Sequence, residues 1–233
     1  IAAFVFSFQA LSLNLFLDSK QYLNENLEPY LEVQYRIPSE SIEFTKNDNE
    51  KWQGAVKITL EVQQNDKVIF ETEYPLFTQE LDELNFRFDL VDFYQIPVGS
   101  GLIKIKIKAM DYLNGLTVER ETELLYKEPF RCSDICLLDN YYFLTQKNSK
   151  SHGKIFTIPR LNNTFQDYSD TISLYLETYK KTGVYSLMVL DEAQNVTYLQ
   201  YIEHTEGNFK QHIIRLPKLK IGSGKLILSL DTE

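Results

Sequence analysis

Apolar and polar residues alternate along much of this chain, in short runs that are separated by turn residues. In residues 29–38, PYLEVQYRIP, apolar positions alternate with polar ones such as Glu32 and Gln34 before Pro38 ends the run. A period of two places alternate side chains on opposite faces of a β-strand. The pattern therefore predicts a strand with one buried face, and Glu32 and Gln34 belong to the other face.

Two hairpins are predicted in the first half of the chain. Residues 54–74, GAVKITLEVQQNDKVIFETEY, alternate on both arms, and Asn65 and Asp66 supply the turn. A second hairpin is expected at Asn114 and Gly115, because a tight turn requires the positive φ that such residues tolerate. We expect about seven strands between Leu13 and Lys127, a spacing typical of β-sandwiches.

The second half of the chain repeats this order of segments. TISLYLETY resembles PYLEVQY, GVYSLMVLDEAQNVTYLQYI resembles the first hairpin, and LPKLKIGSGKLILSL resembles IPVGSGLIKIKI. Three matches in the same order predict a duplicated domain. The fold class predicted is all-β, with two tandem immunoglobulin-like or fibronectin-type β-sandwich domains over residues 13–127 and 128–233. The second domain is expected to be incomplete at its C-terminal end, because no return strand follows GSGKLILSL.

The first residues of the chain have two interpretations. The run IAAFVFSFQALS resembles the apolar core of a secretory signal, with Ala10 and Ser12 as the small residues of a cleavage site. On this interpretation residues 1–12 are a signal-peptide remnant and the protein is exported to the periplasm, the cell surface or the medium. The alternative is a strand, since Phe4, Phe6 and Phe8 alternate with smaller residues.

The composition and the net charge of the chain limit the kinds of molecule that the protein is expected to bind. The chain has 233 residues, 43% of them hydrophobic, with 15 Tyr and 15 Phe, and its formal net charge is -9. The hydrophobic content supports a packed core, and the negative charge disfavours nucleic acid and anionic lipid headgroups as partners. No apolar run reaches the roughly 20 residues that a membrane-spanning helix needs.

Few residues stand out as candidates for chemistry. Cys132 and Cys136 would lie about 13 Å apart on one strand, too far for a disulfide. We interpret them as small apolar residues near the domain junction, with a disulfide across a sharp bend as the alternative. Trp52 is either a binding anchor or a packing residue beside the strand that begins at Gly54.

No catalytic residue, cofactor or metal ligand is assigned from the sequence. The histidines His152, His204 and His212 have no ligand-like spacing to the cysteines. The chain also lacks the G-x-S-x-G turn of a serine hydrolase.

Three segments carry a family resemblance. LNLFLDSKQYLNENLEPYLEVQYRIP, the hairpin that follows it, and RCSDICLLDNY resemble the N-terminal region of the GWxTD-motif proteins of Bacteroidota. The resemblance rests on residues 30–33, 37–38 and 133–135. It implies an exported protein in which β-sandwich domains precede a segment that bears the motif, and it implies no catalytic residues. The G-W-x-T-D motif itself is absent from this sequence.

These features favour an exported, non-catalytic binding or scaffolding module whose partner is another protein or downstream domains of the same chain. The alternative is an accessory region, with carbohydrate as its ligand, of a larger extracytoplasmic enzyme. A sugar-binding sandwich should present exposed, coplanar aromatic rings, whereas a scaffold should bury most of its aromatic residues.

Overall fold

The computed structural model describes residues 12–85, 87–126, 131–146, 150–161, 172–179, 183–205, 207, 209–216 and 225–231. These residues form sixteen β-strands and one short 3-10 helix, with no α-helix among them. The prediction of an all-β protein is therefore confirmed. The expected signal-peptide remnant, residues 1–12, lies outside the described residues except for Ser12.

The elements in chain order are β1 (Phe16–Leu23), β2 (Pro29–Ile37), η1 (Ser39–Ser41), β3 (Thr45–Lys46), β4 (Trp52–Gln53), β5 (Ala55–Gln64), β6 (Lys67–Phe77), β7 (Leu90–Pro97), β8 (Gly101–Asp111), β9 (Thr117–Tyr126), β10 (Cys136–Phe143), β11 (Ile155–Pro159), β12 (Ile172–Tyr179), β13 (Gly183–Leu190), β14 (Val196–His204), β15 (Phe209–Leu216) and β16 (Lys225–Asp231).

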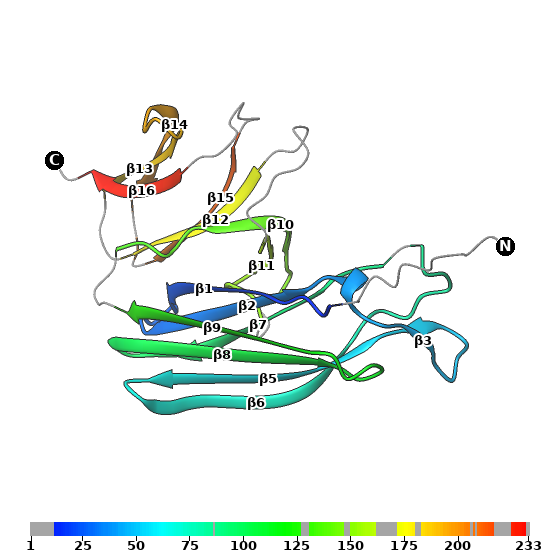
Figure 1. Ribbon diagram of the computed structural model, residues 1–233. Coiled ribbons are helices and arrows are strands. Elements are labelled where there is room, and N and C mark those ends of the chain that lie inside the picture. The colour runs from blue at the N-terminus through cyan, green and yellow to red at the C-terminus, as the bar shows by residue number, and fades with distance from the viewer. Residues whose placement is uncertain are drawn as a thin grey trace. The chain divides into compact units, whose positions relative to one another are not determined.

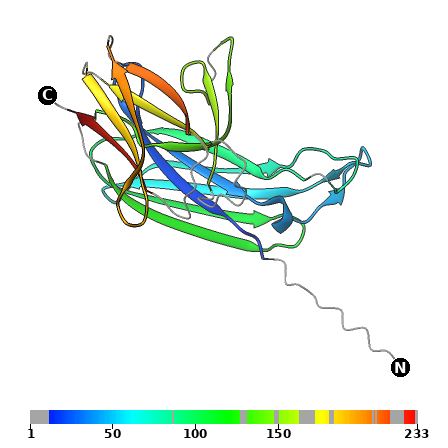
Figure 2. The same ribbon diagram turned by 90° about the horizontal axis from the view of Figure 1, so that it is seen from above.

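These strands form five sheets. Their strand orders are β1-β2-β7, β6-β5-β8-β9, β3-β4, β11-β10-β12-β15 and β14-β13-β16. The long strands β5, β6 and β8 run alongside one another in the two perpendicular views of Figure 1 and Figure 2. The several antiparallel sheets are consistent with β-sandwich architecture.

The first predicted hairpin is confirmed. β5 pairs with β6 in antiparallel register from Ala55↔Phe77 to Gln64↔Lys67. The turn residues Asn65 and Asp66 have φ of 49° and 61°, a conformation that Asn and Asp adopt more readily than most residues. The four apolar residues of one face of β5 are fully buried, and they are Val56, Ile58, Leu60 and Val62.

The turn between β8 and β9 differs from the prediction in one respect. Gly115 has a φ of 72°, but Asn114 is not in the left-handed region. The side chain of Asn114 instead accepts a hydrogen bond of 2.9 Å from the backbone N–H of Leu116. A side chain that bonds to the backbone two residues later stabilises a turn without a positive φ at its own position.

The chain forms two compact units, and neither unit is one continuous segment. Unit 1 holds Tyr35–Asp92 and Ile103–Glu123 with the residues before Asp18, whereas unit 2 holds Asp18–Gln34, Phe93–Leu102 and Leu124–Glu233. The division of the chain into domains of 13–127 and 128–233 stays a prediction.

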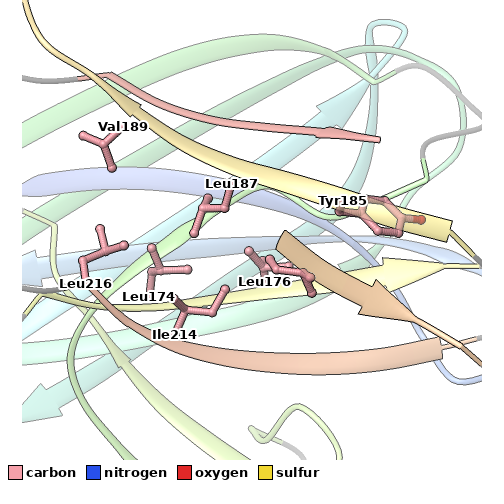
Figure 3. Packing of buried hydrophobic residues seen from close by; sticks show 8 residues of the cluster. Leu174, Leu176, Tyr185, Leu187, Val189, Ile214 and Leu216 are labelled. Atoms are coloured by element: carbon pink, nitrogen blue, oxygen red, sulfur yellow. The ribbon is translucent and has the colours of Figure 1, made fainter. Parts of the chain in front are cut away.

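A hydrophobic core in unit 2 lies between strands β12, β13 and β15. Leu174 and Leu176 of β12, Leu187 and Val189 of β13, and Ile214 of β15 converge in Figure 3. Tyr185, Ile202 and Leu216 complete the buried cluster. Complete burial of a side chain of this size contributes about 1.5–3 kcal/mol to folding, so this cluster is a main source of stability for the unit.

The prediction that β2 has only one buried face is wrong. Glu32 and Gln34, which were expected on the exposed face, have a relative accessibility of 0%, as does Val33 between them. β12 is similar, because Glu177 is only 1% exposed in a strand whose apolar residues are also buried. Buried carboxylates require partners, and these partners define the site described next.

Candidate functional site

A histidine lies between two buried glutamates in unit 2. Nε2 of His152 is 3.0 Å from Oε2 of Glu32, and Nδ1 is 3.6 Å from Oε1 of Glu177. The side chains of all three residues are at most 1% exposed. The contact with Glu32 is an ion pair without the alignment of a hydrogen bond, because Nε2 has no hydrogen-bond partner among the described residues. We call these three residues the charged cluster.

Residues 151–154 form a tight turn that positions His152. The backbone N–H of His152 donates to the carbonyl of Ile155 over 2.8 Å, and the N–H of Ile155 donates back over 2.9 Å. Gly153 has a φ of 57°, and a Cβ there would lie 3.2 Å from Oε1 of Gln211. A side chain at this position would be strained, so the turn that presents the imidazole requires glycine.

Four tyrosines surround the charged cluster. Tyr30 Oη lies 3.1 Å from Nδ1 of His152. Tyr175 and Tyr179 donate their hydroxyl hydrogens to the two oxygens of Glu177. The ring centroids of Tyr22 and Tyr175 are each 4.7 Å from that of His152. The aromatic rings exclude water, while the hydroxyl groups hold one carboxylate.

Three glutamines complete the hydrogen-bonding around the cluster. Gln34 and Gln95 donate to the two oxygens of Glu32 over 2.7 and 3.1 Å. Gln211 donates to the hydroxyl of Tyr175 over 2.7 Å and to the carbonyl of His152 over 2.8 Å. Each carboxylate therefore receives two hydrogen bonds in addition to its contact with His152, which is how the fold tolerates their burial.

The electrostatics keep His152 charged. Burial alone would lower the pKa of His152, but the negative charge of Glu32 and the contacts with both carboxylates raise it to about 10. Burial would likewise raise the pKa of Glu32, yet the charge of His152 and its close contact with the carboxylate, together with hydrogen bonds from Gln34 and Gln95, lower it. Burial raises the pKa values of Tyr30, Tyr175 and Tyr179, so their hydroxyl groups stay protonated.

The raised pKa of His152 differs from the pKa expected of a general base. A general base at neutral pH needs a pKa near the working pH, whereas His152 has one of about 10. The nearby thiol of Cys136 is no activated nucleophile, because burial raises its pKa to about 12.

A pocket of about 220 Å³ opens beside the charged cluster within unit 2. Its lining combines residues from the β1–β2 hairpin, β7, the turn at His152, β12 and β15. The lining residues are Leu23, Asn24, Glu25, Tyr30, Gln95, Pro97, Ser151, His152, Gly153, Glu177 and Phe209. The pocket therefore reaches the charged cluster at His152 and Glu177.

The residues singled out from the sequence lie elsewhere. Trp52 is half-buried in β4 of unit 1, where its backbone N–H donates to the carbonyl of Leu81 over 2.8 Å. Cys132 and Cys136 are free thiols of unit 2. Cys132 packs against the core cluster of Figure 3, and Cys136 packs with Tyr22 and Tyr175. None of the three residues lines the pocket.

The meeting of Glu32, Glu177 and His152 in one buried site was not predicted from the sequence. A signal was present, because the two matched segments both contain Tyr-Leu-Glu, at residues 30–32 and 175–177. Each copy places its Tyr and Glu on one side of a strand, and both copies reach His152. An isolated Tyr-Leu-Glu is unremarkable, and only its repetition on matched strands distinguishes it from an ordinary polar face.

Neither a protein-family model nor a curated protein sequence matches this chain.

In the part of the chain that the structure describes, no group of three or more His, Cys, Asp or Glu side chains could hold a metal ion. The described residues also include no helix that is long and apolar enough to cross a lipid bilayer.

Proposed function

We propose that this protein is an exported, non-catalytic binding or scaffolding module built of tandem immunoglobulin-like β-sandwiches. One observation carries the proposal: the main buried cluster of ionisable groups in unit 2 holds strands together and has no group poised for proton transfer or nucleophilic attack. Ionisable groups in catalytic sites have pKa values matched to the reaction, and His152 lacks that property.

The order of the strands supports tandem domains. In one sheet β5 lies between its hairpin partner β6 and β8, and in another β13 lies between its hairpin partner β14 and β16. Similarly, β2 lies between β1 and β7, while β12 lies between β10 and β15. The matched sequence segments thus occupy matched positions in their sheets, as expected for two copies of one domain. β8 has β9 as a further neighbour, whereas β16 ends its sheet within the described residues.

Exposed apolar side chains supply contact surface for a partner. Leu199 and Tyr201 of β14 are 44% and 62% exposed, and they lie on the same side of that strand. In unit 1, Val68 of β6 is 53% exposed. Both β14 and β6 are outermost in their sheets, and exposed apolar residues on such strands are typical of interaction surfaces.

The carbohydrate-binding alternative is less well supported. Phe143 is 72% exposed, but its ring meets that of Tyr141 at 88°, whereas a sugar platform needs coplanar rings. Many aromatic residues are instead fully buried, among them Tyr22, Tyr35, Tyr126, Tyr175, Tyr179 and Tyr185.

Export, and kinship with the GWxTD-motif proteins of Bacteroidota, belong to the proposal on sequence grounds. They rest on the apolar run at residues 1–12 and on the segments that resemble that family.

Site-specific photo-crosslinking in the native host tests the binding role. A benzoylphenylalanine at position 201 should give a discrete covalent adduct with a protein, and one at the buried position 187 should give none. Purified protein is applied to a glycan array in parallel. Glycan binding without any protein adduct from position 201 or 68 would overturn the proposal in favour of the accessory carbohydrate-binding region.

A further inference from the structure

The pocket beside the charged cluster has an amphipathic lining. Leu23, Pro97 and Phe209 supply apolar surface, whereas Glu177 and Gln95 supply polar groups. Its volume of about 220 Å³ is below the roughly 300 Å³ at which pockets for drug-sized ligands begin. The pocket therefore suits one group of the size of an amino-acid side chain.

Three polar side chains of the pocket each use a hydrogen-bond donor within the protein. Ser151 Oγ donates to the carbonyl of Gly153 over 2.7 Å, and Nδ2 of Asn24 donates to Glu28 over 2.7 Å. Nε2 of Gln95 donates to Glu32 over 3.1 Å. Acceptor capacity remains at Glu177, because each of its carboxylate oxygens has a second lone pair. Asn24 and Gln95 each keep a second amide N–H as well.

The charges around the pocket do not balance. Glu32 and Glu177 share one cationic partner, His152, which is closer to Glu32 at 3.0 Å than to Glu177 at 3.6 Å. Two carboxyl groups therefore share a single imidazole, and Glu177 has the longer contact with it. Glu25 on the pocket lining and the net charge of -9 on the whole chain add to the negative field. A buried net charge is costly unless a counter-charge reaches it.

We propose that this pocket binds a primary alkylammonium group, with the cationic head at Glu177 and the alkyl stem against Leu23, Pro97 and Phe209. The ammonium group has three donors and no acceptor, which complements the second lone pairs of the Glu177 carboxylate. A lysine side chain of a protein and a free aliphatic amine share this chemistry. The pocket does not suit an anion, because Glu177 and Glu25 would repel it.

NMR titration of the intact protein tests the proposal. The probes are n-pentylammonium and N-acetyl-lysine methylamide, and the controls are n-pentanol and pentanoate at the same concentrations and ionic strength. Both ammonium probes should shift the amide resonance of Gly153 saturably, and the two controls should not. Binding of n-pentylammonium alone supports a free amine as the source, whereas binding of both probes supports a lysine side chain as well.

Variants localise the binding. Glu177→Gln keeps the shape of the side chain and should weaken n-pentylammonium binding at least tenfold, because it removes the charge that faces the ligand. Glu25→Lys provides a second test at an exposed position if Glu177→Gln fails to fold, and it should also weaken binding. Glu203→Gln, exposed on β14 and outside the pocket lining, is the matched control and should bind as the wild type does.

Three results would overturn the proposal. These are the absence of saturable shifts in folded protein, equal shifts with n-pentanol, and wild-type affinity in folded Glu177→Gln or in Glu25→Lys. None of them bears on the photo-crosslinking result, so failure of this proposal is distinguishable from failure of the proposed binding role.

Discussion

The positive charge of His152 is what allows two glutamates to be buried in unit 2. Taking a carboxylate out of water costs several kcal/mol, and an opposite charge with well-placed hydrogen bonds offsets that cost. Glu32 and Glu177 have no other cationic side chain among their contacts described above. The imidazole is therefore a structural counter-ion, held by the turn that Gly153 permits.

Replacing His152 should destabilise the protein severely. His152→Gln leaves two buried carboxylates without a cation, and breaking a buried ion pair in this way typically costs about 3–5 kcal/mol. Urea denaturation measures the change in the free energy of unfolding. A loss below about 1 kcal/mol would contradict the structural role of the charge.

Tyr22→Phe is the matched control. It alters a ring 4.7 Å from the imidazole but removes only a hydroxyl that has no hydrogen-bond partner among the described residues. Its stability should equal or slightly exceed that of the wild type.

The two histidines with shifted pKa values should give stability a maximum near neutral pH. The pKa of His152 is raised to about 10, so its contribution is complete below the unfolded value of about 6.5 and is lost as pH rises towards 10. Burial, and then the charges of Lys210 and His204, lower the pKa of His212 to about 4. Its contribution is therefore present above about 6.5 and is lost as pH falls through 4.

Thermal unfolding at a series of pH values measures this profile. His212→Gln should flatten the acidic side, where Glu32, with its lowered pKa, also loses its contribution. Direct NMR detection of the His152 ring provides the more specific check. A His152 resonance that titrates between pH 5 and 8 would show that the ring does not stay protonated.

A comparison of β5 with β2 shows when the alternation of apolar and polar residues predicts which face of a strand is buried. β5 has apolar residues on its buried face and polar residues on its other face, so period-two alternation predicts it correctly. β2 alternates just as regularly, yet both of its faces are buried. Alternation shows which face of a strand is polar and which is apolar. It does not show whether another element covers the polar face.

The partners of Glu32 show why that second face was not predictable. His152 and Gln95 reach Glu32 from positions 120 and 63 residues away, respectively. The local sequence around residue 32 contains no information about these residues. The second Tyr-Leu-Glu, at residues 175–177, matches the first one, but sequence similarity does not say which side chains meet.

The junction between β4 and β5 depends on the absence of a side chain at Gly54. A Cβ at this position would lie 2.8 Å from the carbonyl oxygen of Glu43 and 2.8 Å from Cγ2 of Ile42. Gly54→Ala should therefore cost about 1–3 kcal/mol through overpacking. Differential scanning calorimetry measures the loss, and Thr45→Ala, exposed on β3, should leave the melting temperature nearly unchanged. Equal melting temperatures for the two variants would show that the backbone of residues 42–43 moves aside freely.

At the scale of the whole chain, unit 2 combines segments that are distant in the sequence. Its first segment, Asp18–Gln34, contributes Tyr22 to a buried cluster with Cys136, Leu138, Ile155 and Tyr175. The same segment provides Glu32 and Tyr30 to the charged cluster. The stability of residues 128–233 therefore depends on residues before position 35. The predicted boundaries place these two sets of residues in different domains.

Dividing the chain at the predicted boundary tests this dependence. A fragment of residues 128–233 lacks Glu32 and Tyr22, so it leaves Tyr175 and Leu138 without part of their cover and His152 without its closer carboxylate. We expect this fragment alone to bind a hydrophobic dye and to unfold at a lower temperature than the intact chain.

Mixing the fragment of residues 128–233 with a fragment of residues 13–127 should restore a one-to-one complex in sedimentation. Glu32→Lys in the longer fragment should prevent that association, because it places a second cation against His152. Two fragments that fold independently, match the stability of the intact chain and do not associate would instead support autonomous domains of 13–127 and 128–233.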